Sequence, residues 1–112
     1  MAFKSDITTL VLASLQSGSK HGYLIAKYIR HQSADILIVG ESAIYPVLQD
    51  LEEKEFVTSE WEIQDGRPPR KSYSITQSGL AEIERQRSTW DSFVKSVNSI
   101  FGNRVALEED HA

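Results

Sequence analysis

The fold is decided by one stretch of the sequence, Asp65-Gly66-Arg67-Pro68-Pro69-Arg70-Lys71-Ser72-Tyr73. It places three cations, a glycine and two prolines between two runs that alternate between apolar and polar residues, 57–64 before it and 71–75 after it. The pattern predicts a β-hairpin with a stiff, positively charged tip. Cations at such a tip suit a polyanion such as the phosphate backbone of DNA, although a tip that only keeps the hairpin soluble gives the same pattern.

Two helices are predicted near the start of the chain. The first runs from Ser5 or Asp6 to about Ser17, where Gly18 ends it, and the second follows a cap at Ser19. In the second helix, the residues expected to be buried are Tyr23, Leu24, Tyr28 and Ile29.

A third helix precedes the hairpin. Apolar residues at the i, i+3, i+4 and i+7 positions are Ile44, Val47, Leu48 and Leu51. Ser42 is the expected cap, and Pro46 is tolerable only within the opening turn, so the helix is expected to begin near Ser42 or slightly later. The apolar run 36–39 before it is either a short strand or a packed connection.

The last helix is expected to run from Thr76 to about Phe101, before Gly102. Its steps of three and four residues form a heptad seam, which consists of Leu80, Ile83, Arg87, Trp90, Val94, Val97 and Phe101. One copy of so small a fold cannot bury this seam, so we expect a two-fold homodimer in which Arg87 pairs with an acid across the interface or specifies the register. Trp90 is either part of the dimer core or a platform for a planar ligand.

The order of three helices, a hairpin and a long helix predicts an α+β winged helix-turn-helix with a C-terminal dimerisation helix. We expect residues 1–75 to form the winged-helix DNA-binding domain and residues 76–102 the dimerisation helix. Residues 103–112 are expected to form a flexible acidic tail.

Composition narrows the classes of protein. The 112 residues contain no cysteine, which excludes disulfides and thiolate chemistry. The first residues lack the apolar run of a signal peptide, and no stretch is long enough to span a membrane, so we expect a soluble cytoplasmic protein. The three histidines are scattered, and no spacing fits a metal site, a nucleophile elbow or a phosphate-cradling glycine loop. We therefore expect neither an enzyme nor a cofactor. The net charge of −4 argues mildly against nucleic acid, but a local cluster of cations governs phosphate contact.

Several motifs resemble the PadR family of winged-helix transcriptional regulators, in its short form. They are His21-Gly22-Tyr23, the stretch 42–48 (Ser-Ala-Ile-Tyr-Pro-Val-Leu), Leu51-Glu52-Glu53, and the wing from Gly66 through Thr76 to Gly79. The resemblance implies a homodimeric repressor whose hold on DNA is weakened by a ligand, a small planar aromatic effector in some members. The family often has glycine where Glu55 stands. Glutamate does not take the left-handed conformation cheaply, so this helix end is expected to be built differently.

The expected DNA-binding residues come from three places. They are Ser42, Ala43, Tyr45 and Gln49 in the third helix; Arg67, Arg70 and Lys71 in the wing; and Lys20, His21 and Tyr23 at the start of the second helix. For two of these groups a structural role is the alternative. Tyr45 would then brace its helix against the wing, and His21 and Tyr23 would pack between the second and last helices.

A function of another class competes with DNA binding. The acidic balance, and the lack of arginine or lysine in the third helix before Lys54, fit a ligand-sensing or protein-interaction module. Such a module would keep the fold and have little DNA affinity.

Overall fold

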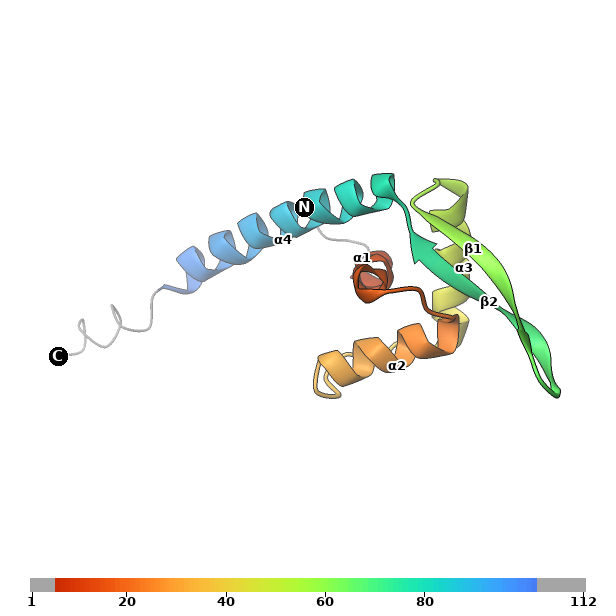
Figure 1. Cartoon of the computed structure of the whole chain (residues 1–112). Helices are drawn as coiled ribbons and strands as arrows, with labels where there is room; N and C mark the ends of the chain where they lie inside the picture. The colour runs from red at the N-terminus through yellow and green to blue at the C-terminus, as the bar shows by residue number, and fades with distance from the viewer. Residues whose placement is uncertain (1–5, 103–112) are drawn as a thin grey trace.

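The computed structural model describes residues 6–102. The elements are α1 (Asp6–Ser14), the 3₁₀ turn η1 (Leu15–Ser17), α2 (Gly22–Gln32), α3 (Glu41–Glu53), β1 (Val57–Gln64), β2 (Arg67–Ile75) and α4 (Gln77–Phe101). This order confirms the α+β winged-helix prediction. Figure 1 shows α1, α2 and α3 gathered beside the β1–β2 hairpin, while α4 runs away from them. In the described part of the chain, no helix has the length and apolar character needed to cross a membrane.

The core lies where α1, α2 and α3 meet the base of the hairpin and the first turns of α4. Its buried residues are Val11, Leu12, Leu15, Ile25, Ile29, Ile44, Leu48, Leu51, Val57, Tyr73 and Ile83. The predicted apolar face of α3 is confirmed at Ile44, Leu48 and Leu51. The prediction for α2 was wrong at Tyr23 and Leu24, which are both exposed, since its inward face carries Ile25 and Ile29 instead.

Helix α2 begins later than expected. Its N-cap is His21 and not Ser19, because His21 has the extended backbone of a cap and its Nδ1 accepts a hydrogen bond from the Leu24 amide at 3.4 Å. Between α2 and α3, the run 36–39 forms no strand. Ile36 and Ile38 in this connection are exposed, and Val39 packs against the core.

Helix α3 begins at Glu41, with Gly40 as its N-cap, so its start lies slightly before Ser42. Pro46 is consequently the sixth residue of the helix and lies beyond its opening turn, which corrects the expectation from sequence. A proline there removes one backbone hydrogen bond. The buried face of Ile44, Leu48 and Leu51 nevertheless holds the helix in place.

The hairpin is tighter at its tip than predicted. Only Asp65 and Gly66 separate the strands, and Gly66 has a φ of 70°, a conformation that glycine adopts without strain. The antiparallel register pairs Glu62 with Arg70 and Gln64 with Arg67, so Pro68 and Pro69 lie opposite Ile63 alone. This is a β-bulge, and it explains how two prolines fit inside a strand.

The junction of α3 with the wing corrects the expectation for Glu55. Glu55 does take a left-handed conformation, with a φ of 62°. Its amide donates to the Glu52 carbonyl at 3.0 Å, and the Phe56 amide donates to the Leu51 carbonyl at 2.9 Å, which together form a Schellman motif. The Glu55 carbonyl accepts hydrogen bonds from the hydroxyls of Thr76 at 2.8 Å and Ser78 at 3.0 Å. These bonds tie the start of α4 to the end of α3.

Helix α4 has the bounds that the sequence predicts. Thr76 caps it by accepting a hydrogen bond from the Gly79 amide at 3.0 Å, and it ends at Phe101 before Gly102. One member of the predicted seam is used differently, because Ile83 is 3% exposed and packs in the core of its own chain. Ile83 is therefore removed from the expected dimer interface. The expected tail, 103–112, lies outside the described residues.

Candidate nucleic-acid interface

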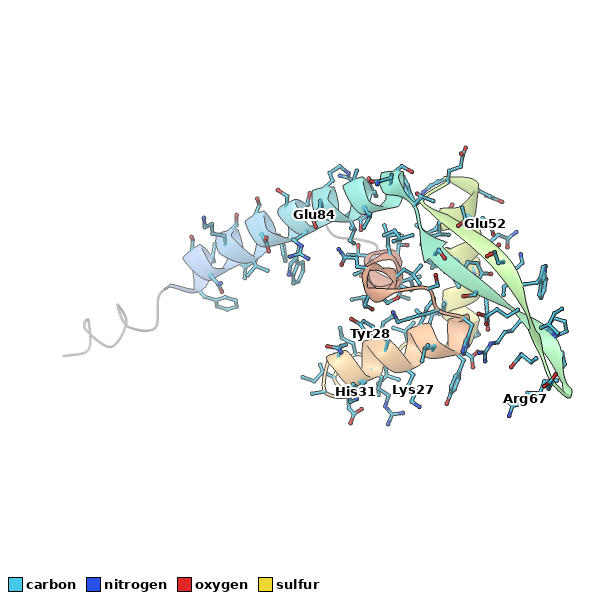
Figure 2. All side chains as sticks on the ribbon, in the orientation of Figure 1. Lys27, Tyr28, His31, Glu52, Arg67 and Glu84 are labelled. Carbon is cyan, nitrogen blue, oxygen red and sulfur yellow. The ribbon has the colours of Figure 1, made fainter. Side chains whose placement is uncertain are left out.

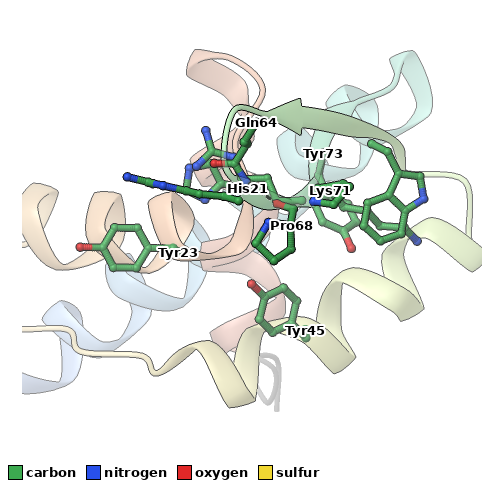
Figure 3. Close-up of a pocket in the computed structure, with 11 residues that line it drawn as sticks. His21, Tyr23, Tyr45, Gln64, Pro68, Lys71 and Tyr73 are labelled. Carbon is green, nitrogen blue, oxygen red and sulfur yellow. Dashed lines mark hydrogen bonds between the residues drawn. The ribbon is translucent and has the colours of Figure 1, made fainter.

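A hollow of about 670 Å³ opens between the start of α2, helix α3 and the two wing strands. It is lined by His21, Tyr23, Tyr45, Trp61, Gln64, Arg67, Pro68, Pro69, Arg70, Lys71 and Tyr73. Figure 3 shows Tyr23, Tyr45 and Pro68 around this space, each contributed by a different element. The structure thus brings together six of the ten residues predicted from sequence to contact DNA.

Tyr45 lies in the middle of this surface and is 46% exposed. Its hydroxyl donates a hydrogen bond to Glu41 Oε2 at 3.2 Å. Burial raises the pKa of Tyr45, and the hydrogen bond to Glu41 raises it further, so the phenol keeps its proton and remains a donor at neutral pH. The side chain needs the neighbouring glycine, because a Cβ on Gly22 would lie 2.7 Å from Tyr45 Cε1 and Cζ.

His21 and Tyr23 lie side by side at the start of α2, and their rings are stacked with centroids 6.1 Å apart. Both line the hollow, which differs from the alternative that they pack between α2 and α4. Since His21 Nδ1 accepts the capping hydrogen bond, we assign the proton of the neutral ring to Nε2. Burial lowers the pKa of His21, and the nearby Arg70 guanidinium lowers it further, which favours this neutral form.

Lys20 does not lie on this surface. It is 8% exposed, and its Nζ donates to the Ser14 carbonyl and the Ser17 hydroxyl, both at 2.7 Å, and to the Gly18 carbonyl at 3.3 Å. Three donors saturate an ammonium group. The expectation that Lys20 contacts a phosphate is therefore not met in this structure, where the side chain secures the end of α1 and η1.

The three wing cations are exposed to different degrees and paired differently. Arg70 Nε donates to Glu62 Oε1 across the strands at 3.1 Å, and Lys71 Nζ lies 5.5 Å from the centroid of the Trp61 ring. Arg67 is exposed and forms no ion pair with any residue in the described range 6–102. Trp61 is 66% exposed. Figure 2 places Arg67 at the far end of the hairpin.

The other α3 candidates extend the surface away from the wing tip. Ser42 and Gln49 are exposed, while Ala43 is half-buried. Gln49 lines a second hollow of about 530 Å³ together with Tyr45 and Lys71, and Glu52 and Glu53 line the same space. These acids would repel phosphates. The part of α3 suited to a polyanion therefore ends at Gln49, before the acids of the last turn.

The structure adds two residues that sequence reasoning missed. Gly22 admits the Tyr45 ring, and the sequence indicates no role for it beyond its place in the motif His21-Gly22-Tyr23. Ile63 is exposed near the wing tip, where the alternating pattern of the strand indicates only that it shares a face with Trp61. Trp90 lies on α4, outside the lining of the hollow, and its ring centroid is 5.8 Å from that of Phe93.

Within residues 6–102, no group of histidine and acidic residues could hold a metal ion.

Comparison with known proteins gives consistent matches. The profile of the transcriptional regulator PadR-like family matches residues 11–85. The negative transcriptional regulator PadR of Bacillus subtilis is 32% identical over 73 residues, which are 65% of this chain and 40% of that protein. This chain therefore spans less than half the length of that relative.

Solved structures show the same fold. A transcriptional regulator from Clostridium thermocellum superposes with a TM-score of 0.75 and 25% identity, over 82% of this chain and 89% of that one. Bacillus subtilis PadR in complex with operator DNA superposes with a TM-score of 0.66 and 29% identity, over 71% of this chain and 45% of that one.

Proposed function

Because this chain belongs to the PadR-like family of transcriptional regulators, we propose that it acts by binding double-stranded DNA through the hollow between α2, α3 and the wing. The observation that carries the proposal is the arrangement around that hollow. Donors from three elements face one open space: the Tyr45 hydroxyl, the His21 ring and the Arg67 guanidinium. Hydrogen-bond donors and cations that converge in this way suit the phosphate backbone.

The proposed docking follows winged-helix geometry. The part of α3 up to Gln49 enters the major groove, where Ser42 and Gln49 face the base edges and Ala43 lies beside them. Tyr45 turns its single hydroxyl hydrogen from Glu41 to a phosphate, and neutral His21 donates from Nε2 at the start of α2. The wing cations contact the DNA backbone that flanks the groove; they are Arg67, Arg70 and Lys71. To bind a phosphate, Arg70 gives up its ion pair with Glu62.

We propose that residues 76–102 form a dimerisation helix and that residues 1–75 form the DNA-binding unit. Beyond Ile83, α4 continues its apolar stripe through Trp90, Val94, Val97 and Phe101. Val94 and Val97 are half-buried and Phe101 is exposed, so pairing with a second copy would remove apolar surface from water. Two copies would then present two α3 helices to a roughly palindromic operator, with half-sites about 34–36 Å apart.

The direction of regulation follows the named relative, which is a negative regulator. We propose repression, and release by a small planar aromatic ligand that stacks on Trp90 and changes the angle between the two winged domains. Tryptophan fluorescence tests the ligand site. Quenching by a planar aromatic compound should disappear in Trp90→Phe, and quenching that persists would point to Trp61.

The test of DNA binding removes the wing cations together, in Arg67→Ala/Arg70→Ala/Lys71→Ala. A matched control, Lys54→Ala/Arg85→Ala/Lys95→Ala, changes the net charge equally at exposed positions outside the lining of the hollow. Each lost phosphate contact reduces the slope of log K against log salt by about 0.9, so the wing variant should lose about 2.7 per protomer. The proposal fails if the two triple variants bind DNA with equal affinity and slope.

Dimerisation is tested by sedimentation at several protein concentrations. Val97→Glu places a charge in the apolar stripe and should yield monomers. Lys95→Glu changes an exposed residue of α4 that does not share a hollow with Val97, and it should leave the dimer intact. A wild-type protein that stays monomeric at high concentration would remove the dimer from the proposal.

A further inference from the structure

Among the described residues, the attachments of helix α4 to the other elements gather near its start. The Thr76 and Ser78 hydroxyls donate to the Glu55 carbonyl. Ile83 follows, buried in the core, and the Gln86 side chain then reaches α1. Within residues 6–102, no hydrogen bond or ion pair joins α4 to another element beyond Gln86. Figure 1 shows the remainder of α4 running away from the other helices, so its direction is set by these attachments.

A hydrogen-bonded network makes the last of the attachments. Thr9 Oγ1 in α1 donates to Gln86 Oε1 at 2.7 Å. Gln86 Nε2 donates to Glu82 Oε2 at 2.7 Å, and Arg85 donates to both oxygens of the same carboxylate. The hydrogen bonds from Arg85 hold the pKa of Glu82 below its usual value, so Glu82 remains an acceptor at neutral pH. Glu82 thus fixes the Gln86 amide, whose oxygen faces Thr9.

The place of the Thr9–Gln86 bond on α4 gives it leverage. Ile83 is held by apolar packing, which is not directional, whereas a hydrogen bond restricts the angle between its partners. The stretch of α4 from Ile83 to Phe101 is about 27 Å long at a rise of 1.5 Å per residue. A tilt of about 7° at Ile83 would therefore move the end of α4 by about 3.4 Å, the length of one base-pair step.

We propose that the Thr9–Gln86 hydrogen bond fixes the angle between α4 and the DNA-binding helices, and thereby sets the half-site spacing that the dimer accepts. This inference rests on the proposed DNA binding and dimer. Both copies carry the bond, so the two-fold axis applies one angle to both α3 helices. Thr9 and Gln86 lie outside the lining of the hollow, and they act as positioning residues.

The variants remove the bond from either side. Thr9→Val deletes the hydroxyl and keeps the shape of the side chain, whereas Thr9→Ser keeps the hydroxyl and should rescue the wild-type behaviour. Gln86→Leu removes the acceptor. Thr8→Val is the matched control, since Thr8 is also a half-buried threonine of α1 and its hydroxyl donates to no other described side chain or carbonyl. Thermal unfolding checks that each variant is folded.

The angle is measured first without DNA, as the distance between spin labels on the two copies. The chain contains no cysteine, so Glu53→Cys in each full-length variant places one label per copy on the exposed end of α3. We expect one narrow distance in the otherwise wild-type protein and with Thr9→Ser or Thr8→Val. Thr9→Val and Gln86→Leu should give a broad distribution, because the helix can then tilt.

The spacing is measured on the segment just upstream of the protein's own gene, with one or two base pairs inserted between the half-sites. The wild type should prefer the original duplex about tenfold over the altered ones. Thr9→Val and Gln86→Leu should reduce that preference to about threefold or less, while a single half-site should bind all variants within about twofold. A loss of stability alone would weaken binding to every duplex alike.

Two results overturn the inference and are distinguishable. If Thr9→Val and Gln86→Leu keep the narrow label distance and the wild-type preference for spacing, the bond does not fix the angle, although the proposed function stands. If the wild type binds no DNA even at low salt, the proposed function fails and the assignment of half-site spacing fails with it.

Discussion

Replacing Gly22 by alanine should separate DNA binding from stability. A Cβ at this position would lie 2.7 Å from two ring atoms of Tyr45 and 2.8 Å from its hydroxyl oxygen, distances at which one group must move. Tyr45 is the group that yields, because it is 46% exposed and only its hydrogen bond to Glu41 holds the hydroxyl. The Gly22→Ala change therefore turns the Tyr45 ring away from the hollow without opening the core.

The magnitudes follow from the contacts that change. Losing one exposed hydrogen bond costs about 0.5–1.5 kcal/mol, and alanine is favoured over glycine in a helix by about 0.5–1 kcal/mol, so the free energy of unfolding should change by less than about 1 kcal/mol. A hydrogen bond to a charged group such as a phosphate contributes about 1.5–3 kcal/mol. Displacing Tyr45 should therefore weaken DNA binding at least tenfold.

Urea unfolding and fluorescence anisotropy with labelled DNA measure the two quantities on the same variants. The control is a double-mutant cycle in which Gly22→Ala is added to Tyr45→Ala. Without the ring, the added alanine should have no further effect on affinity. The reasoning is refuted if Gly22→Ala leaves affinity unchanged, or if it weakens binding by the same factor whether or not Tyr45 is present.

Three further predictions concern the helix ends that shape this surface. Glu55→Gly should raise the free energy of unfolding by up to about 1 kcal/mol in urea titrations, because Glu55 has a φ of 62°, while Glu55→Ala, which keeps the strain, should not stabilise. Lys20→Met should lower the free energy of unfolding by about 1–3 kcal/mol, because it leaves the Ser14 and Gly18 carbonyls without their donor. The folded fraction of this variant should bind DNA as the wild type does. A loss of affinity larger than the unfolded fraction explains would show that Lys20 belongs to the interface. The pKa of His21 is lowered in the folded chain, so the unfolded chain binds the proton more readily and stability should fall as pH drops through about 6.5. His21→Asn keeps a capping acceptor and should weaken that dependence on pH relative to the wild type, whereas an identical profile would show that other groups set it.

The elements were predictable where local pattern and packing agree. The heptad steps of α4, the apolar face of α3 and the alternation of the wing are repeated signals along the chain, and each element formed where they occur. The cap of α2 was harder to predict because Ser19 and His21 can both accept a hydrogen bond. Which of them caps depends on the backbone of the folded turn.

The remaining differences depend on how the folded backbone brings particular groups together. Lys20 is buried because the carbonyls at the end of α1 and η1 lie within reach of its long side chain, a fact that no local pattern contains. Glu55 is held in its left-handed conformation by hydroxyls that lie 21 and 23 residues further along the chain. The bulge opposite Ile63 depends on how the two strands pair, which the alternation within one strand does not predict.

The central claim, specific binding of DNA, is tested most directly by a salt titration of the wild-type protein. Binding to the DNA just upstream of its own gene is compared with binding to a scrambled duplex of equal length. We predict tighter binding to the upstream segment, with an affinity that falls steeply as salt rises. No binding to either duplex at low salt would contradict the account and favour a sensing or interaction module on the same fold.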